Sequence, residues 1–347
     1  MRYDDSNRGL SLDERLEQRG INRREFLSFT AKIAAVMGMT PAFGTEIACA
    51  LTSDTRPSVI YLNLAECTGC TEALLRTESP TFTEVILDII SLDYSETLMA
   101  AAGDAAERAL RQTMADPRGY LCIVEGAIPT ANDGHFGHAG GRTLLELAKE
   151  VTAGAKAVIA YGACANYGGV QAAAPNPTGA KGVGDALEGI RPINVAGCPP
   201  NPINLVGTLA HLISLGPPQL DAQGRPVRFY GRTVHDQCDR LEHFYAGRFA
   251  PALDSPEARR GWCLYTLGCK GPYAHNNCPT QLFNQTSWPV KAGHPCIGCS
   301  EPRFWDELAP IYEPVGTREA PSSDSGSTAE PDLATTAASP PEGARRG

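Results

Sequence analysis

The stretch PSVIYLNLAEC, residues 57–67, decides the fold of this chain. Its run of apolar and β-favouring residues predicts a strand, and the chain then passes into a loop that carries a cysteine. Apolar runs of the same kind predict four more strands, at residues 83–94, 120–129, 156–164 and 193–200. Helical spacing of Ala and Leu predicts helices at residues 95–116, 140–154 and 202–216. Strands that alternate with helices predict an α/β fold with a doubly wound parallel sheet.

The composition changes after Pro218. Residues 218–314 are dense in Gly, Pro, His, Cys and aromatic residues and show neither a helical nor a strand period. Such a segment needs another organiser for its core, and metal-binding side chains would serve. The length of 347 residues leaves room for this second, smaller and mostly irregular domain. The formal net charge of −9 disfavours nucleic acid as a partner.

Both ends of the chain are expected to lie outside the folded domains. Residues 1–50 predict a cleaved signal peptide, because an arginine pair in NRREFL is followed by an apolar stretch and the small residues ACA. The arginine pair favours twin-arginine (Tat) export to the periplasm, and the alternative is an amphipathic helix of a cytosolic protein. Residues 315–347 predict a disordered polar tail. We expect no transmembrane helix after the signal.

Cysteines follow three of the predicted strands. Cys67 and Cys70 form the motif ECTGC after the first strand, and Cys164 and Cys198 each follow another. Because the carboxyl ends of parallel strands share one edge of a sheet, these four thiols should gather there. Four thiolates flanked by glycines suit a 4Fe–4S cluster, with zinc as the alternative. Cys122 lies inside an apolar strand and is expected to be a core residue.

The second segment carries further cysteines at metal-ligand spacing. One set consists of His235, Cys238, Cys263 and Cys269, and both zinc and iron–sulfur chemistry accept a His-Cys₃ set. The chain has twelve cysteines, of which Cys49 would leave with the signal. With Cys122 in the core and the two earlier sets set aside, the cysteines that remain are Cys278, Cys296 and Cys299. This third set therefore has three thiols and no spare cysteine as a fourth ligand.

Disulfide bonds are the competing explanation for the cysteines of an exported protein. A mature chain of this length does not need covalent cross-links to be stable. C-x-x-C pairs are also more typical of metal or redox sites than of structural disulfides. The sequence therefore favours metal-bound thiolates.

These motifs, in this order, resemble the small subunits of nickel–iron hydrogenases. The resemblance runs through ECTGC, GACANYGGVQ, GCPPNP, HDQC, CLYTLGCKGP and NNCPTQLFNQTSWPVKAGHPCIGCSEPRFWD. It implies a flavodoxin-like domain over residues 51–217 and a cluster-binding domain over residues 218–314. It also implies a heterodimer with a large subunit, whose nickel–iron centre splits hydrogen. This chain would be the electron-transfer subunit of that oxidoreductase.

The resemblance also implies a ligand set for each cluster. A proximal 4Fe–4S cluster would be held by Cys67, Cys70, Cys164 and Cys198. A distal 4Fe–4S cluster would be held by His235, Cys238, Cys263 and Cys269. A medial 3Fe–4S cluster would be held by Cys278, Cys296 and Cys299, with Pro289 where a fourth cysteine would otherwise reach it. Electrons would pass from the proximal through the medial to the distal cluster, and then to an acceptor such as a cytochrome or another redox protein.

Three further positions refine this expectation. Oxygen-tolerant members carry two extra cysteines near the proximal cluster, where this chain has Gly69 and Gly169, so we expect oxygen-sensitive activity. Glu66 stands where the family has a glutamate near the large subunit that helps to move protons, although a structural carboxylate is the alternative. The rival functions are a stand-alone electron carrier, which would purify without a nickel-containing partner, and a cytosolic hydrogen sensor, which would lack the export signal.

Overall fold

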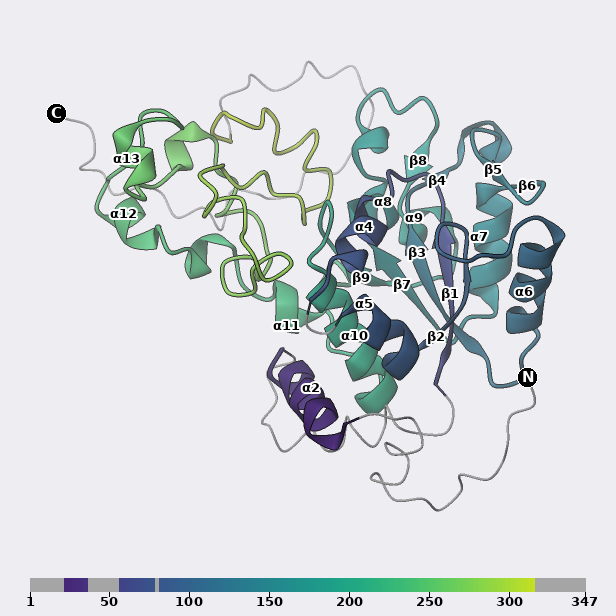
Figure 1. Cartoon of the computed structure of the whole chain (residues 1–347). Coiled ribbons are helices and arrows are strands. Elements are labelled where there is room, and N and C mark those ends of the chain that lie inside the picture. Colours follow the sequence, from purple (N-terminus) through teal and green to yellow (C-terminus); the bar gives the residue numbers. More distant parts are fainter. Residues whose placement is uncertain (1–21, 37–55, 79–80, 316–347) are drawn as a thin grey trace. The chain divides into compact units, whose positions relative to one another are not determined.

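The computed structural model describes residues 22–36, 56–78 and 81–315 (Figure 1). The chain divides into two units, the first ending at Phe229 and the second beginning at Tyr230. The sequence places this division earlier, after residue 217. Residues 218–229 join the first unit because Asn194 binds their turn: its backbone N–H donates to the Gly224 carbonyl (2.8 Å) and its amide to the Gln223 carbonyl (2.7 Å).

A five-stranded parallel sheet forms the first unit. Strand β1 (Ser58–Asn63) pairs with β2 (Ser91–Ser95) on one side and β3 (Tyr120–Glu125) on the other. The sheet continues through β7 (Ala157–Tyr161) to β9 (Ile193–Val195). The spatial order β2-β1-β3-β7-β9 is the flavodoxin-like order 2-1-3-4-5 when these five strands are counted along the chain. The predicted α/β fold is therefore confirmed.

Helices cover both faces of this sheet (Figure 1). Val59 and Tyr61 of β1 pack in one cluster with α4 (Gly69–Leu75) and α10 (Pro202–Leu215). Ile60 and Leu62 pack in the other with α6 (Asp104–Met114) and α7 (Leu144–Ala153). Burial on both faces explains why the strands are continuous apolar runs. Cys122 is fully buried in the second cluster, as predicted.

Two predicted helices begin and end as their sequences indicate. Helix α7 starts with a capping box, in which the Thr143 hydroxyl accepts the Glu146 N–H and the Glu146 carboxylate accepts the Thr143 N–H. Helix α10 starts at Asn201, whose side chain accepts the Ile203 N–H, and ends at Gly216.

Two other predictions were partly wrong. Residues 83–94 are not one strand, because a short helix α5 (Phe82–Glu84) and a π-helix η2 (Val85–Ile89) precede β2. The cause is a capping box between Thr81 and Glu84, which starts a helical turn. Residues 95–116 are helical only from Asp104, because the Glu96 carboxylate instead accepts the Asn63 backbone N–H of β1 (3.0 Å).

Shorter elements complete the first unit. Two small antiparallel pairs join β4 (Ile128–Pro129) to β8 (Ala180–Lys181) and β5 (His138–Ala139) to β6 (Arg142–Thr143). The remaining turns are η3 (Ala131–Gly134), α8 (Ala163–Tyr167), η4 (Val170–Ala172) and α9 (Val183–Ala186). Helix α2 (Arg23–Val36) buries Phe26 and Ala34 in the cluster that contains α10. The small residues 48–50 and the tail from residue 316 lie outside the described residues.

The second unit is mostly irregular, as predicted. Its helices are single turns: η5 (His235–Gln237), α12 (Leu241–Tyr245), α13 (Pro256–Arg259) and η6 (Tyr265–Leu267), with α11 (Val227–Tyr230) at the division. A small apolar cluster around Leu264, Trp288 and Val290 forms the core, and several cysteines pack against it. Within the described ranges, no helix has both the length and the apolar character that crossing a membrane requires.

Candidate functional site

The first four cysteines stand at the carboxyl edge of the sheet. Cys67 and Cys70 follow β1, Cys164 lies in α8 directly after β7, and Cys198 follows β9. In an open α/β sheet this edge is where ligands bind. Parallel strand order thus brings together residues that are as far apart in sequence as Cys67 and Cys198.

The structure gathers these four thiols closely enough for every pair to interact. Cys70 interacts electrostatically with the other three, Cys164 also with Cys67 and Cys198, and Cys198 with Cys67. Burial, followed by the neighbouring Cys198 thiol, raises the pKa of Cys164 to about 12. Crowded thiols of raised pKa resist ionisation by themselves, whereas a coordinated metal deprotonates its thiol ligands.

Glycines keep space open beside these sulfurs. A Cβ atom on Gly162 would lie 2.4 Å from the Cys70 Sγ, and one on Gly169 would lie 2.4 Å from the Cys164 Sγ. Both glycines have positive φ, +98° and +68°. At Gly69 a Cβ would lie 3.1 Å from the Cys67 Sγ. The two glycines that the resemblance singled out, Gly69 and Gly169, therefore do lie against thiols of this set.

Sequence reasoning missed the carboxylate that holds the first C-x-x-C loop. Glu125, at the end of β3, is 1% exposed and accepts the backbone N–H of Cys70 (3.0 Å) and of Thr71 (3.1 Å). It also accepts the hydroxyl protons of Thr71 (2.5 Å) and Tyr61 (2.6 Å). A carboxylate with four such donors fixes the loop rigidly. The only sequence signal was an acidic residue at the end of an apolar strand.

Glu66 lies at the edge of the same site. Its Oε1 accepts the Thr68 hydroxyl proton (3.2 Å), while its buried Oε2 has no hydrogen-bond partner among the described residues. Burial, followed by the nearby Glu125 carboxylate, raises the pKa of Glu66. A raised pKa makes this carboxyl easier to protonate, and its unpartnered oxygen leaves room for a proton.

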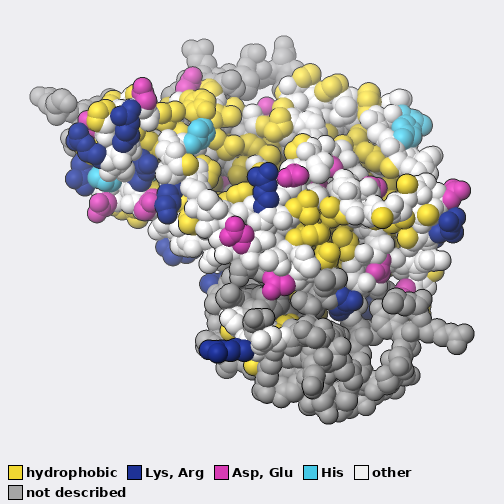
Figure 2. Space-filling model, in the orientation of Figure 1, with side chains coloured by type: hydrophobic (Ala, Val, Ile, Leu, Met, Phe, Trp, Pro, Cys, Tyr) yellow, Lys and Arg dark blue, Asp and Glu magenta, His cyan; other side chains and the backbone are white. Residues whose placement is uncertain are grey.

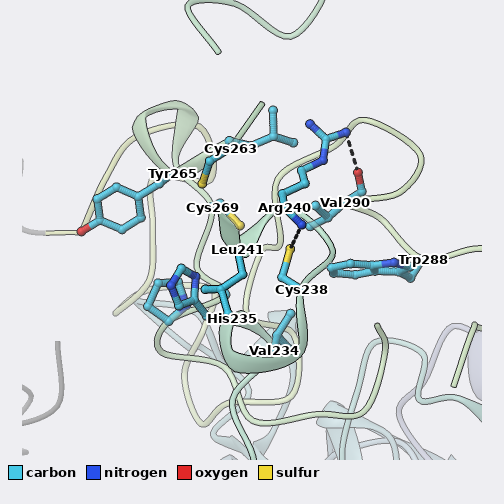
Figure 3. Close-up of a pocket in the computed structure, with 13 residues that line it drawn as sticks. Val234, His235, Cys238, Arg240, Leu241, Cys263, Tyr265, Cys269, Trp288 and Val290 are labelled. Carbon is cyan, nitrogen blue, oxygen red and sulfur yellow. Dashed lines mark hydrogen bonds between the residues drawn. The ribbon is translucent and has the colours of Figure 1, made fainter. Parts of the chain in front are cut away.

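The second set surrounds a pocket in the second unit. The pocket contains about 350 Å³ of atom-free space, part of it open to solvent. Figure 3 shows the Cys238, Cys263 and Cys269 sulfurs and the His235 ring around this space. All three thiols interact electrostatically with one another. The His235 Nε2 is buried and has no hydrogen-bond partner among the described residues, so it is free to act as a ligand.

A buried arginine supports this pocket. The Arg240 guanidinium donates to the carbonyls of Trp262 (2.7 Å) and Val290 (3.1 Å), and the Arg240 backbone N–H donates to the Cys238 Sγ (3.4 Å; Figure 3). The pKa of Cys238 is raised to about 12, because the effect of burial outweighs the opposing effect of this N–H. Arg240 therefore links the loops around the pocket by hydrogen bonds and also places a positive charge beside the thiols.

The third set also gathers. Cys296 interacts electrostatically with Cys299 and Cys278, and Cys278 with Cys299. Burial, followed by Cys299, raises the pKa of Cys278 to about 12. Pro289 is exposed, and its carbonyl accepts the His294 N–H (2.8 Å). Cys296 also interacts with Cys269 of the second set, so the second and third sets lie close together.

Comparisons with known proteins point to one family. Residues 230–312 match the family model for the C-terminal region of the NiFe/NiFeSe hydrogenase small subunit, and residues 67–212 match that of the NADH ubiquinone oxidoreductase 20 Kd subunit. The periplasmic [NiFe] hydrogenase small subunit 1 of Nitratidesulfovibrio vulgaris Hildenborough is 61% identical over 304 residues, which is 87% of this chain and 96% of the relative. The hydrogenase-2 small chain of Escherichia coli K12 is 44% identical over 82% of this chain and 78% of its own length.

Solved structures give the same result. A crystal structure of the Ni-Fe-Se hydrogenase from Desulfomicrobium baculatum, in a reduced, active form, contains a chain that is 34% identical to this one. The match has a TM-score of 0.68 and covers 75% of this chain and 100% of that chain. The chain belongs to the family of nickel–iron hydrogenase small subunits.

Proposed function

We propose that this chain relays electrons within a heterodimeric nickel–iron hydrogenase. Hydrogen is oxidised in the large subunit, and the electrons leave through three iron–sulfur clusters in this chain to an external acceptor. The observation that carries the proposal is the gathering of ten cysteines and one histidine into sets of four, four and three. The names of the relatives, all hydrogenase small subunits or chains, support the same role.

The ligand sets suit clusters better than single ions. In the described part of the chain, no three His, Cys, Asp or Glu side chains are placed to hold one metal ion. A tetrahedral zinc ion would need all its thiolate sulfurs at about 2.3 Å from the one ion. An iron–sulfur cluster instead spreads its ligands over several irons. The glycines beside Cys70 and Cys164 and the unpartnered His235 Nε2 leave space and a donor for such a group.

Each cluster is assigned by its number of ligands. Cys67, Cys70, Cys164 and Cys198 hold the proximal 4Fe–4S cluster. His235, Cys238, Cys263 and Cys269 hold the distal 4Fe–4S cluster. Cys278, Cys296 and Cys299 would hold the medial cluster, and three thiolates favour the 3Fe–4S form, which lacks one iron. When bound, such clusters exchange single electrons, and the residues around them set their potentials.

Electrons leave near His235. Its ring lies edge-on to Phe244, with centroids 4.5 Å apart, and Phe244 contacts Tyr245 in the same way at 5.8 Å. Tyr245 is 63% exposed. Figure 2 shows charged side chains gathered over α12 and α13. Arg248 and Arg259, in the same part of the chain, are exposed. An exposed aromatic ring within a charged rim is typical of a transient docking surface, so the acceptor is a redox protein such as a cytochrome.

The complex works in the periplasm. Two relatives at 61% and 56% identity are named periplasmic hydrogenase small subunits. The arginine pair at Arg23 and Arg24 and the small residues 48–50 support export by the twin-arginine route.

Glu66 exchanges protons with the large subunit, since its Oε2 has no partner among the described residues.

Purification through an affinity tag on this chain tests the proposal. We expect a second subunit that contains nickel, and eleven irons in this chain from two four-iron clusters and one three-iron cluster. Electron paramagnetic resonance (EPR) should show the oxidised 3Fe–4S signal. Cys238→Ala should lower the iron content, whereas Cys122→Ala, which changes a core cysteine, should leave it unchanged. A chain that purifies alone, or with no acid-labile sulfide, contradicts the proposal.

A further inference from the structure

Lys270 connects two of the ligand sets. It follows Cys269 of the distal set, and its backbone N–H donates to the carbonyl of Cys296, a medial ligand (2.7 Å). The Cys269 thiol in turn accepts the backbone N–H groups of Gly271 and Cys296. The two sets are therefore joined directly, and Lys270 lies at the junction.

The Lys270 side chain is fully buried, at 0% exposure. Lysine is almost never completely buried unless its charge has partners. Its amine donates to the main-chain carbonyls of Pro310 (3.1 Å) and Glu313. Carbonyl oxygens solvate an ammonium without cancelling its charge. The packing holds this arrangement, because the backbone of Gly268 lies against residues 311–313 so closely that a Cβ would be 2.5 Å from the Glu313 N.

The charge of this amine acts on both sets. It interacts electrostatically with the Cys269 thiol and with the Cys296 thiol. The Glu313 carboxylate also interacts with it, but that side chain is exposed and screened by water. A buried positive charge near a redox group stabilises the reduced form, because reduction adds negative charge in a medium of low dielectric.

We propose that Lys270 is a positioning residue that raises the reduction potentials of the medial and distal clusters together. The inference rests on the proposed ligand assignment. One charge shared by both sets shifts both potentials in the same direction. It thereby keeps both clusters reducible by hydrogen-derived electrons without opening a large potential step between them.

Lys270→Gln in the purified heterodimer tests this inference, because glutamine keeps hydrogen-bond donors for the two carbonyls but carries no charge. Redox titration followed by EPR gives the midpoint potential of each cluster. We expect at least a threefold loss in the equilibrium constant for reducing the medial cluster. At 59 mV per tenfold change, this corresponds to a fall of about 28 mV in its midpoint potential. The distal cluster should shift in the same direction. Lys270→Arg should retain the wild-type potentials.

Lys291→Gln is the matched control. Lys291 is an exposed lysine that lies five residues before Cys296, so its charge is screened and its loss should leave both potentials unchanged. Unchanged potentials in Lys270→Gln, with cluster signals at full intensity, overturn the inference. If Lys270→Gln and Lys270→Met both lose the clusters, the residue is structural and the inference is also overturned. A wild-type heterodimer without the 3Fe–4S signal would instead refute the ligand assignment.

Discussion

Gly162→Ala should remove the proximal cluster while leaving the fold intact. Gly162 has φ 98° and ψ 155°, a region that is almost restricted to glycine. Alanine there costs about 1–3 kcal/mol in backbone strain. The added Cβ would also lie 2.4 Å from the Cys70 Sγ. Ordinary contact needs roughly 3.5 Å, so the thiol must move by roughly 1 Å from its position as a ligand.

Gly216→Ala separates the strain from the contact. Gly216 has φ 83° and ψ −165°, which is the same region, but nothing lies within 4 Å of its would-be Cβ. Both variants should lose about 1–3 kcal/mol of unfolding free energy, measured by denaturant titration. Only Gly162→Ala should lose iron, by up to the four atoms of the proximal cluster, together with the corresponding EPR signal.

Two results would refute this reasoning. A Gly162→Ala protein with full iron content and an unchanged proximal signal would show that Cys70 does not need its present position. Equal iron loss in Gly216→Ala would show that backbone strain, and not the contact with Cys70, controls cluster assembly.

Four further predictions test other parts of the site. Pro289→Cys should supply a fourth medial thiolate and convert the cluster to 4Fe–4S with a lower potential; persistence of the oxidised 3Fe–4S EPR signal would show that ligand number does not set the cluster type. Glu66→Gln should slow hydrogen turnover with unchanged cluster spectra, and normal turnover would exclude a proton role. Glu125→Gln should destabilise the first unit by about 1–3 kcal/mol in denaturant titrations, because the amide nitrogen cannot accept the Tyr61 and Thr71 hydroxyl protons that the second carboxylate oxygen accepts; an unchanged midpoint would argue against its anchoring role. The Arg118 hydrogen bonds lower the pKa of Asp116 to about 2. The ionised Asp116 side chain therefore stabilises the folded state above its ordinary pKa near 3.9. This stabilisation is lost as the pH falls toward 2. The acid-side decline of the urea midpoint should therefore be shallower in Asp116→Asn, and an identical pH profile would contradict this.

Local signals identified most of the secondary structure correctly. Helices α7 and α10 carry their own caps at Thr143 and Asn201, so neighbouring residues determine where they begin. The strand predicted at residues 83–94 was partly wrong because β-favouring residues outweighed the capping box at Thr81 in the sequence reading. The helix predicted at residues 95–116 began too early because Glu96 binds a strand that is distant in sequence.

The amino-acid sequence by itself determined the fold class and predicted the sorting of the cysteines. Strands and helices alternate locally, thiols follow strand ends, and counting leaves the third set with three cysteines. The tertiary structure decided which buried polar groups support these sets. Glu125 reaches Cys70 across 55 residues, and Lys270 reaches the Pro310 carbonyl across 40. Such contacts depend on strand order and loop packing, which bring together residues that share no local pattern. The division at Phe229 has the same cause, since residues 218–229 are held by a strand that precedes them in the sequence.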